Sequence, residues 1–302
     1  MNKIIPPYLK KGDTVAIVSP SFSIDAAKIP GAVAFLENAG FKVRLGKNLL
    51  KTDGPFAGTD EERLSDFQEM TDDKSVKAVF CSRGGYGLSR IIGKIDFTAT
   101  RMQPKWYVGF SDVTVLHLWL DRVCGLVSLH AEMPLNYTNE NKSAETFDTL
   151  LKALSGELTG TLWKGTALKS APAEGEITGG NLSLIYSMIG TKGEPETRGK
   201  ILFIEDVGEY YYHIDRMMTS LRMAGLLDGL SALLVGGFRD IQDGKVAWGR
   251  SIEETIANAV SGYNYPVFFG FPAGHISDNR AVYNGRKAAI AGEGDVVKLL
   301  YS

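Results

Sequence analysis

The first half of the chain repeats a short strand pattern followed by a helix pattern, and this repeat limits the possible folds more than any other feature. The strand patterns are apolar or alternating runs bounded by turn residues, at 14–18, 41–45, 76–80, 106–108 and 125–129. Between them, Pro30 fits the first turn of a helix that ends near Gly40, and Thr59 and Glu62 have capping-box spacing. Repeated strand–helix–strand units predict an α/β fold, with helices on both faces of a parallel sheet.

The pattern changes after about residue 140, and a chain of 302 residues exceeds the usual size of one hydrophobic core. We therefore predict an α/β domain at 1–155, a glycine-containing linker at 156–169 and a smaller α+β domain at 170–302. The last segment has strand patterns at 281–283, 287–290 and 296–301. Asn284-Gly285, a strong hairpin signal, and a turn at 292–295 separate them. These signals predict an antiparallel meander at the C-terminal end.

Composition argues against several kinds of partner. The formal net charge of -2 provides no electrostatic footprint for nucleic acid or an anionic membrane. No run of about 18 apolar residues occurs, and the first residues lack the apolar region of a signal peptide. Cys81 and Cys124 are the only cysteines, which fits a reducing compartment, and no Cys/His cluster has metal-ligand spacing. We expect a cytoplasmic protein that uses no metal or other cofactor.

Ser111 is the first candidate for chemistry. The run Gly109-Phe110-Ser111-Asp112 directly follows the strand pattern at 106–108 and precedes a helical pattern at 113–120. A serine on such a turn projects its hydroxyl from the carboxyl end of the sheet, and the next backbone N–H can form half of an oxyanion hole. On this segment alone, a serine that only caps the helix is the favoured interpretation. In addition, the second glycine of the hydrolase elbow Gly-x-Ser-x-Gly is missing, because position 113 is Val.

A glycine-rich loop, Arg83-Gly84-Gly85-Tyr86-Gly87, follows another strand pattern. Clustered glycines let backbone N–H groups approach a ligand closely, so this loop could supply the second oxyanion donor. It does not have the dinucleotide-binding pattern, because Arg90 stands where the third glycine belongs, and it lacks P-loop spacing.

His275 and Glu205 are the candidates for acid–base chemistry. His275 lies among turn residues after the apolar run 267–269, and catalytic bases are often carried by such loops. Glu205 ends the strand pattern 201–204, where it could cap a downstream helix or orient a histidine. Among the other histidines we expect His117 to be half-buried, His130 to be a secondary site residue and His213 to have a surface or packing role.

Seven segments in a fixed order connect these candidates. They are Lys11-Gly12-Asp13, Val18-Ser19-Pro20-Ser21, Ser82-Arg83-Gly84-Gly85-Tyr86-Gly87, Gly109-Phe110-Ser111-Asp112, Gly179-Gly180-Asn181-Leu182, Phe203-Ile204-Glu205-Asp206 and Phe271-Pro272-Ala273-Gly274-His275. Together they resemble the serine LD-carboxypeptidases, the muramoyl-tetrapeptide carboxypeptidase family that includes the microcin-immunity peptidases. The resemblance covers nearly the whole chain.

The resemblance implies that Ser111 is the nucleophile, His275 the general base and then acid, and Glu205 the orienting carboxylate. It implies an oxyanion hole made by the N–H of Asp112 and one from Gly84 or Gly85. It also implies a flavodoxin-like N-terminal domain that carries Ser111, a C-terminal domain that carries the other two residues, and an active site between them. Members of the family are typically homodimers that release D-alanine from the muropeptide stem by cutting an L,D-peptide bond.

Two further residues are candidates for substrate binding. A carboxypeptidase must bind a free carboxylate, and the Arg83 guanidinium can do so with two hydrogen bonds, although it could equally brace the glycine loop. Asn181 could hydrogen-bond substrate backbone, or it could be the N-cap of the helix that follows it.

Two other functions remain open. A microcin-immunity-type enzyme would cleave a peptidyl- or aminoacyl-nucleotide, and its site needs aromatic surface to stack a base, for which the predicted linker offers only Trp163. A non-catalytic two-domain protein that closes on a small ligand is the alternative of another class. The joint presence of Ser111, Glu205 and His275 argues against this binder.

Overall fold

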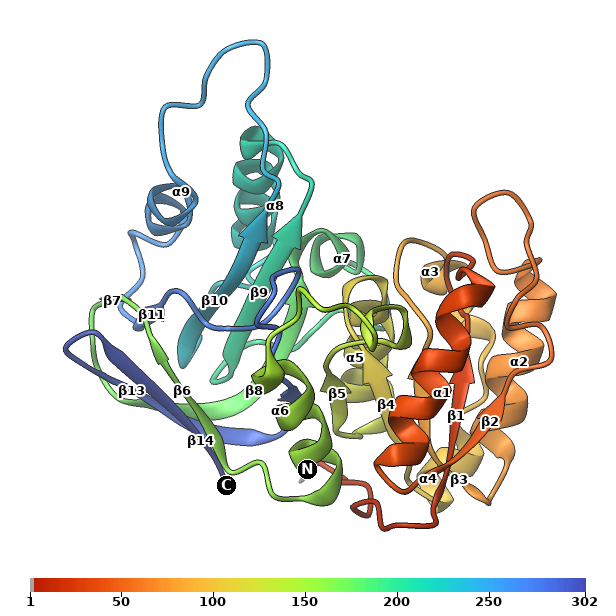
Figure 1. Cartoon of the computed structure of the whole chain (residues 1–302). Coiled ribbons are helices and arrows are strands. Elements are labelled where there is room, and N and C mark those ends of the chain that lie inside the picture. Colours follow the sequence, from red (N-terminus) through yellow and green to blue (C-terminus); the bar gives the residue numbers. More distant parts are fainter. Residues whose placement is uncertain (1–2) are drawn as a thin grey trace.

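Two β-sheets organise residues 3–302, which the computed structural model describes, and they lie side by side (Figure 1). The first sheet has the strand order β12-β5-β4-β3-β1-β2. Its strands are β1 Thr14–Val18, β2 Lys42–Leu45, β3 Val76–Cys81, β4 Trp106–Gly109, β5 Ser128–His130 and β12 Val282–Asn284. The first five pair in parallel, and β12 joins β5 in the antiparallel direction. The predicted parallel sheet is confirmed.

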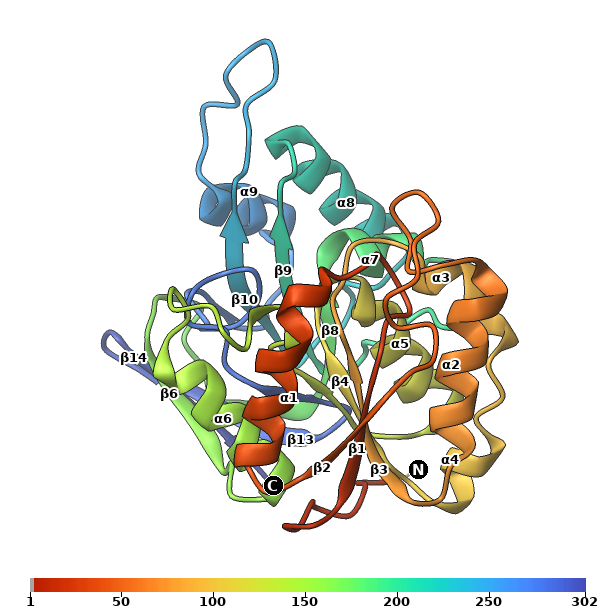
Figure 2. The ribbon, with the colours of Figure 1, turned by 45° about the vertical axis from the view of Figure 1, so that its right-hand side comes forward.

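Helices cover both faces of this sheet, because successive residues of its central strands are apolar and point to opposite sides. On β1, Ile17 belongs to the core cluster that contains Leu36 of α1, whereas Val18 belongs to the cluster that contains Phe67 of α2. Figure 2 shows α1 and α6 on one side of the strands and α2, α3 and α5 on the other. The helices are α1 Ile29–Asn38, α2 Asp60–Asp72, α3 Leu88–Ile91, α4 Thr98–Met102, α5 Thr114–Trp119 and α6 Ala144–Ser155.

Local signals set the helix ends. Pro30 lies in the first turn of α1, and the Thr59–Glu62 capping box before α2 has both of its reciprocal hydrogen bonds. None of the helices within residues 3–302 has the length and apolar character needed to cross a bilayer.

The second sheet has eight strands in the order β6-β14-β13-β8-β9-β10-β11-β7. They are β6 Gly160–Lys164, β7 Ala167–Leu168, β8 Ala173–Asn181, β9 Ile201–Val207, β10 Ala232–Arg239, β11 Val267–Phe268, β13 Lys287–Glu293 and β14 Val296–Tyr301. Strands β8 to β11 are parallel, whereas β6, β7, β13 and β14 are antiparallel to their neighbours, as expected for an α+β unit. Its helices are α7 Leu182–Ser187, α8 Tyr211–Met223 and α9 Ile252–Ala259.

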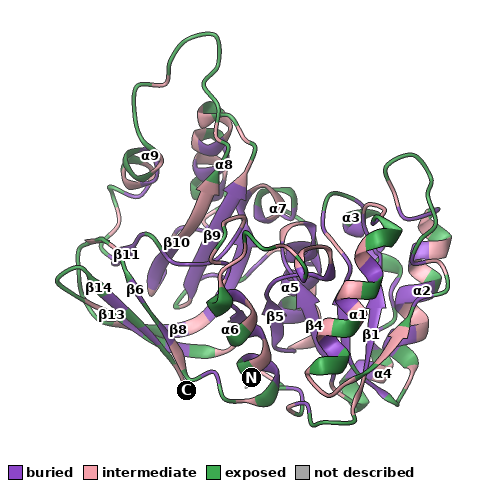
Figure 3. Ribbon diagram, viewed as in Figure 1, coloured by how far each residue is buried: buried purple, intermediate pink, exposed green. Residues whose placement is uncertain are grey.

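The two sheets share one continuous hydrophobic core. Residues of α5 from the first unit, such as Val115 and Leu116, are in the same buried cluster as Leu182 and Ile185 of α7. Figure 3 shows buried residues along β4, β5 and β9, and exposed residues on outer helix faces and on the long loop between β10 and α9. Since full burial of a leucine contributes about 1.5–3 kcal/mol, this shared core holds the two units together.

The expected hairpin at Asn284-Gly285 is wrong. Strand β12 pairs with β5 of the first sheet, and β13 pairs with β8 and β14 of the second. Gly285, with φ of 92°, lets the chain pass from one sheet to the other, and the Asn284 side chain donates to the carbonyl of Gly179 at 2.9 Å. The hairpin between β13 and β14 is confirmed. The domain boundaries stay a prediction, and the expected linker 156–169 contains β6 and β7 of the second sheet.

Candidate active site

Ser111 lies just beyond the carboxyl end of β4, on a turn with strained backbone. Its φ is 66°, in the left-handed region that costs an L-residue about 1–2 kcal/mol. Ser111 is half-buried and opens a single 3-10 turn that continues into α5. The residue before the turn is Phe110, and no side chain caps it, so Ser111 does not have the simple capping role weighed above. A strained serine at a strand end is typical of an exposed nucleophile.

The glycine loop packs directly against this serine. A Cβ atom placed on Gly84 would lie 2.7 Å from the Cβ and 2.8 Å from the Oγ of Ser111, and 3.3 Å from the backbone N of Asp112. Only glycine therefore fits here. The Gly84 backbone therefore lies close to both the Ser111 side chain and the backbone nitrogen of Asp112.

The Asp112 carboxylate ties the serine turn to the glycine loop. It is fully buried, and its Oδ2 accepts hydrogen bonds from Ser21 Oγ at 2.6 Å and from the Leu88 N–H at 2.9 Å. Burial raises the pKa of this carboxyl despite those two hydrogen bonds. Because the side chain points into the protein, Asp112 can serve a substrate only through its backbone N–H.

His275 and Glu205 form a hydrogen-bonded pair between the second sheet and the loop after β11. The Nδ1 atom of His275 lies 2.7 Å from Glu205 Oε2, and Glu205, on β9, is fully buried. Gly274 is close to the same carboxylate, since a Cβ there would lie 2.7 Å from Glu205 Oε2. The His275 ring packs against Phe110, the residue before Ser111, with ring centroids 4.8 Å apart and the rings tilted by 58°. The imidazole is thus held beside the serine turn.

The charge of Glu205 favours the protonated imidazole. Burial alone would lower the pKa of His275, but Glu205, with smaller contributions from Asp206 and Glu132, outweighs burial and raises the pKa above 6.5. The Oε1 atom of Glu205 has no hydrogen-bond partner within 3–302, so the carboxylate interacts chiefly through Oε2 with the imidazole.

His117 supports the serine turn, a role that the sequence did not reveal. Its Nε2 lies 2.8 Å from the carbonyl O of Gly109, and its Nδ1 lies 2.8 Å from Ser128 Oγ. His117 is fully buried rather than half-buried, and burial lowers its pKa to about 4, so the ring is neutral and Nε2–H donates to Gly109. Ser128 then donates to Nδ1. This bond holds the strand end from which Ser111 projects.

His130 lies under Phe110 with its ring centroid at 5.7 Å and is almost fully buried. Burial lowers its pKa well below 6.5, and neither ring nitrogen has a hydrogen-bond partner in the described part of the chain. His213, by contrast, lies near the surface and pairs with Glu209 at 2.8 Å.

The two substrate-binding candidates already have partners within the protein. Arg83 donates from Nη1 to the carbonyl of Ser23 at 3.1 Å, and its guanidinium lies 5.8 Å from the Phe22 ring centroid. Asn181 is the N-cap of α7, which was the alternative to substrate binding considered for this residue. Its Nδ2 donates to Asp206 Oδ1 at 2.8 Å. Burial, then the charge of Glu205, raises the pKa of Asp206 to about 7.

The site therefore consists of two groups of residues that meet at Phe110: Ser111 with the glycine loop, and His275 with Glu205. An open polar cavity of about 580 Å³ borders the His275 loop and is lined by Asn139, Asn141, Lys142, Arg239, Ile276 and Ser277. No group of three or more His, Cys, Asp or Glu side chains that could hold a metal ion occurs between residues 3 and 302. The arrangement brings together a serine hydroxyl, an imidazole paired with a carboxylate, and the backbone of a glycine loop.

The chain matches known protein families along most of its length. Residues 15–131 match the LD-carboxypeptidase N-terminal domain, and residues 174–290 match the LD-carboxypeptidase C-terminal domain. It is 40% identical to a probable murein peptide carboxypeptidase of Bacillus subtilis, covering 94% of this chain and 91% of that protein. It is 26% identical to the microcin C7 self-immunity protein of Escherichia coli, covering 96% of this chain and 93% of the relative.

Solved structures agree with this assignment. The crystal structure of muramoyltetrapeptide carboxypeptidase from Oxalobacter formigenes superposes with a TM-score of 0.87 at 28% identity, covering 96% of this chain and 98% of the other. Both family domains occur here in the expected order. The chain belongs to the LD-carboxypeptidase family of peptidases.

Proposed function

We propose that the protein is a serine-type LD-carboxypeptidase in which Ser111 is the nucleophile, His275 the general base and Glu205 the residue that orients His275. The observation that carries this proposal is the 2.7 Å pair between His275 and Glu205, whose imidazole packs against Phe110, the residue before the strained, half-buried Ser111. A serine hydroxyl is a poor nucleophile unless a base removes its proton. An imidazole fixed by a buried carboxylate beside the serine turn provides that base.

The reaction would proceed through an acyl-enzyme. Ser111 Oγ attacks the scissile carbonyl while Nε2 of His275 takes its proton, and Glu205 stabilises the imidazolium that forms. The N–H of Asp112 and one from Gly84 or Gly85 stabilise the oxyanion. His275 then protonates the leaving amine, and a water molecule, activated by the same base, hydrolyses the ester.

The proposed substrate is a muropeptide tetrapeptide, from which the enzyme releases the C-terminal D-alanine during cell-wall recycling. The names of the Bacillus and Oxalobacter relatives support this substrate class. Arg83, at the start of the glycine loop, is the proposed partner of the terminal carboxylate. Arg239, which lines the polar cavity beside His275, would attract a further carboxylate of the stem.

Cleavage of nucleotide-linked peptides, which the microcin-immunity relative suggests, is the second candidate. It needs an aromatic surface for the base, but Trp163 is buried against Phe271, with ring centroids 4.9 Å apart, and donates to the Phe269 carbonyl at 3.1 Å. This indole cannot stack a nucleobase without leaving its packing site. The muropeptide is therefore the favoured substrate. We also propose a cytoplasmic homodimer, as is typical of the family.

The deciding experiment is mass spectrometry of the purified protein incubated with L-Ala-γ-D-Glu-diaminopimelate-D-Ala, beside the Ser111→Ala variant. Release of D-alanine by the wild type alone supports both the reaction and the nucleophile. If nothing is released while a fluorophosphonate still labels Ser111, nucleotide-linked peptides become the substrate to test. If the label also fails to react, the non-catalytic binding protein becomes the better explanation.

A further inference from the structure

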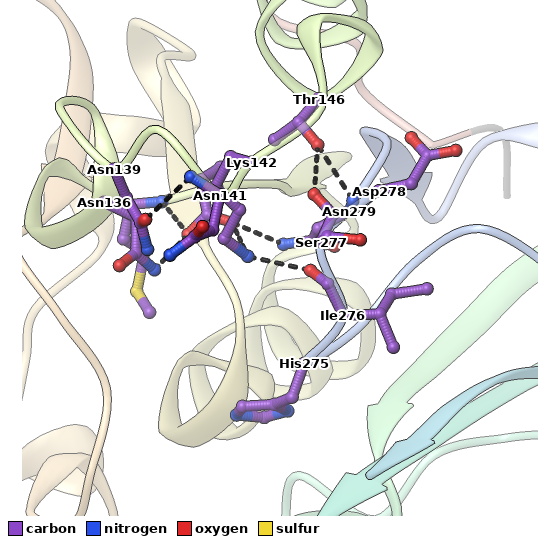
Figure 4. Close-up of polar contacts among 12 residues, drawn as sticks. Asn136, Asn139, Asn141, Lys142, Thr146, His275, Ile276, Ser277, Asp278 and Asn279 are labelled. Atoms are coloured by element: carbon purple, nitrogen blue, oxygen red, sulfur yellow. Dashed lines mark hydrogen bonds and ion pairs between the residues drawn. The ribbon is translucent and has the colours of Figure 1, made fainter.

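The loop that carries His275 is fastened to the unit that carries Ser111, although in the chain it follows β11 of the second sheet. Residues 274–279 form hydrogen bonds with the segment 132–146, which directly follows β5 of the first sheet (Figure 4). Since β5 pairs with β4, which leads into Ser111, base and nucleophile are anchored to neighbouring strands of one sheet.

Two hydrogen bonds hold the backbone one peptide group away from His275 on each side. After the histidine, Lys142 Nζ donates to the carbonyl O of Ile276 at 2.8 Å, a contact that Figure 4 shows directly. Before it, the N–H of Gly274 donates to Asn279 Oδ1 at 2.8 Å. Because the backbone is held on both sides of His275, the path of the chain through His275 is restricted.

One buried carboxylate joins the two contacts. Glu132 Oε2 lies 2.6 Å from Lys142 Nζ and accepts a hydrogen bond from Asn279 Nδ2 at 3.2 Å. Its Oε1 accepts from Asn136 Nδ2 at 2.8 Å and from the N–H of Met133 at 3.1 Å. Glu132 is fully buried, and the Lys142 side chain is only 10% exposed, so solvent screens this network little.

We propose that Glu132 is a positioning residue for the reaction, acting through Lys142 and Asn279 to set the placement of the His275 imidazole relative to Ser111. This inference rests on the proposed serine mechanism. Glu205 fixes the tautomer and the rotation of the ring, whereas Glu132 fixes the backbone from which the ring projects. Catalysis needs both, because a displacement of about 1 Å at a reacting group costs on the order of 100-fold in rate.

Other hydrogen bonds attach the 274–279 loop to the segment 132–146 without the Glu132 side chain. Ser143 Oγ donates to Asp278 at 2.9 Å, and Thr146 Oγ1 donates to the Ser277 carbonyl at 3.1 Å and accepts from the Asn279 N–H at 2.9 Å. These bonds hold residues 277–279 and do not involve Glu132 or Lys142. Loss of the Glu132 network should therefore leave the loop attached but let its His275 end shift.

The test compares Lys142→Met and Glu132→Gln with Lys152→Met, in which the lysine lost is 46% exposed and pairs with Asp148 on the surface of α6. Each protein is assayed for kcat and KM on the tetrapeptide and for the rate at which a fluorophosphonate labels Ser111. Melting temperatures are recorded alongside. Both network variants should lose about 10- to 100-fold in kcat and in labelling rate with little change in KM, and Lys152→Met should match the wild type.

The outcomes distinguish this inference from the proposed function. If the wild type neither releases D-alanine nor reacts with the probe, the serine mechanism itself fails. If both network variants are labelled as fast as the wild type, Glu132 does not position His275 and the inference is wrong. If Glu132→Gln does not fold, Lys142→Met alone tests the inference, because the methionine side chain preserves most of the packing of the lysine stem. A rise in KM at constant kcat in Lys142→Met would also overturn the inference, because such a result would assign Lys142 to substrate binding.

Discussion

The Nδ1 atom of His275 lies 2.7 Å from Oε2 of Glu205, and this hydrogen bond links a loop to the buried strand β9. The Glu205 side chain is completely buried, whereas that of His275 is 18% exposed. The carboxylate therefore acts on the imidazole in a low-dielectric setting, while part of the His275 side chain remains exposed. The pair has the form of an orienting acid and a general base.

The first prediction concerns pH. A general base works only when neutral, and Glu205 raises the pKa of His275 above 6.5, outweighing burial. We expect kcat/KM to rise with pH through an apparent pKa above 6.5. In Glu205→Gln the acidic limb should move to lower pH, and kcat should fall by about 10³–10⁴-fold, as for other orienting carboxylates. Steady-state pH profiles of both proteins check this, and an acidic limb that does not move would contradict the role of Glu205.

The second prediction concerns Gly84. An alanine there would put its Cβ 2.8 Å from Ser111 Oγ, so the serine hydroxyl or the glycine loop must shift. We expect Gly84→Ala to lose on the order of 100-fold in kcat/KM, because the nucleophile and an oxyanion donor move apart. Gly93→Ala is the matched control, since a Cβ at Gly93 meets nothing within 4 Å. Equal activity of the two variants would show that Gly84 does not border the reacting atoms.

The third prediction concerns the strain at Ser111. Its φ of 66° suits glycine, whereas alanine keeps the strain of serine. Both Ser111→Gly and Ser111→Ala should be inactive, but Ser111→Gly should exceed Ser111→Ala by about 1 kcal/mol in free energy of unfolding. Urea unfolding measures the difference. A less stable glycine variant would mean that the turn relaxes in solution and that the serine is not held under strain.

Local features of the sequence predicted the fold well. The parallel sheet covered on both faces followed from strand and helix periodicity, and the ends of α1 and α2 followed from Pro30 and from the Thr59–Glu62 box. These signals act over a few residues, so the sequence displays them directly. The family motifs likewise led to the LD-carboxypeptidase assignment that the two domain matches confirm.

Long-range pairing could not be predicted in the same way. Asn284-Gly285 has the chemistry of a tight hairpin, yet β12 bonds to β5, which is more than 150 residues earlier in the chain. A turn signal reports local backbone freedom and says nothing about which sheet has an open edge. The link from Glu132 to Lys142 and Asn279, and the bond from His117 to Gly109, were missed because each residue resembles an ordinary buried or surface polar group.

The fourth prediction concerns Arg83. If its guanidinium binds the substrate's terminal carboxylate, Arg83→Ala should raise KM for the tetrapeptide at least about tenfold and abolish the preference over the C-terminal amide. Arg90→Ala is the control, because Arg90 is 46% exposed and pairs with Asp60. Competition between free-acid and amidated peptides measures the preference. An unchanged preference would leave Arg83 with only the structural contacts to Ser23 and Phe22.

The fifth prediction concerns a second contact between the two units, on the far end of α5 from Ser111. Asp121 is buried and pairs with Lys3 at 2.8 Å and with Lys200, next to β9, at 3.3 Å. Removing the carboxylate takes the Asp121 ion pair from Lys3 and leaves Lys200 with Glu176, at 3.2 Å, as its acidic partner. Because both lysines are 13–16% exposed and can turn toward water, Asp121→Ala should cost about 2–3 kcal/mol, at the low end for a broken buried pair.

Asp148→Ala is the matched control, since Asp148 is 53% exposed and its pair with Lys152 lies on the surface of α6. It should cost less than about 0.5 kcal/mol, and added salt should remove even that difference. Urea unfolding of both variants at low and high salt measures the two costs. If Asp121→Ala were as mild as the control, the Lys3–Asp121–Lys200 cluster would not stabilise the contact between the units, and the shared core around α5 and α7 would be sufficient to hold them together.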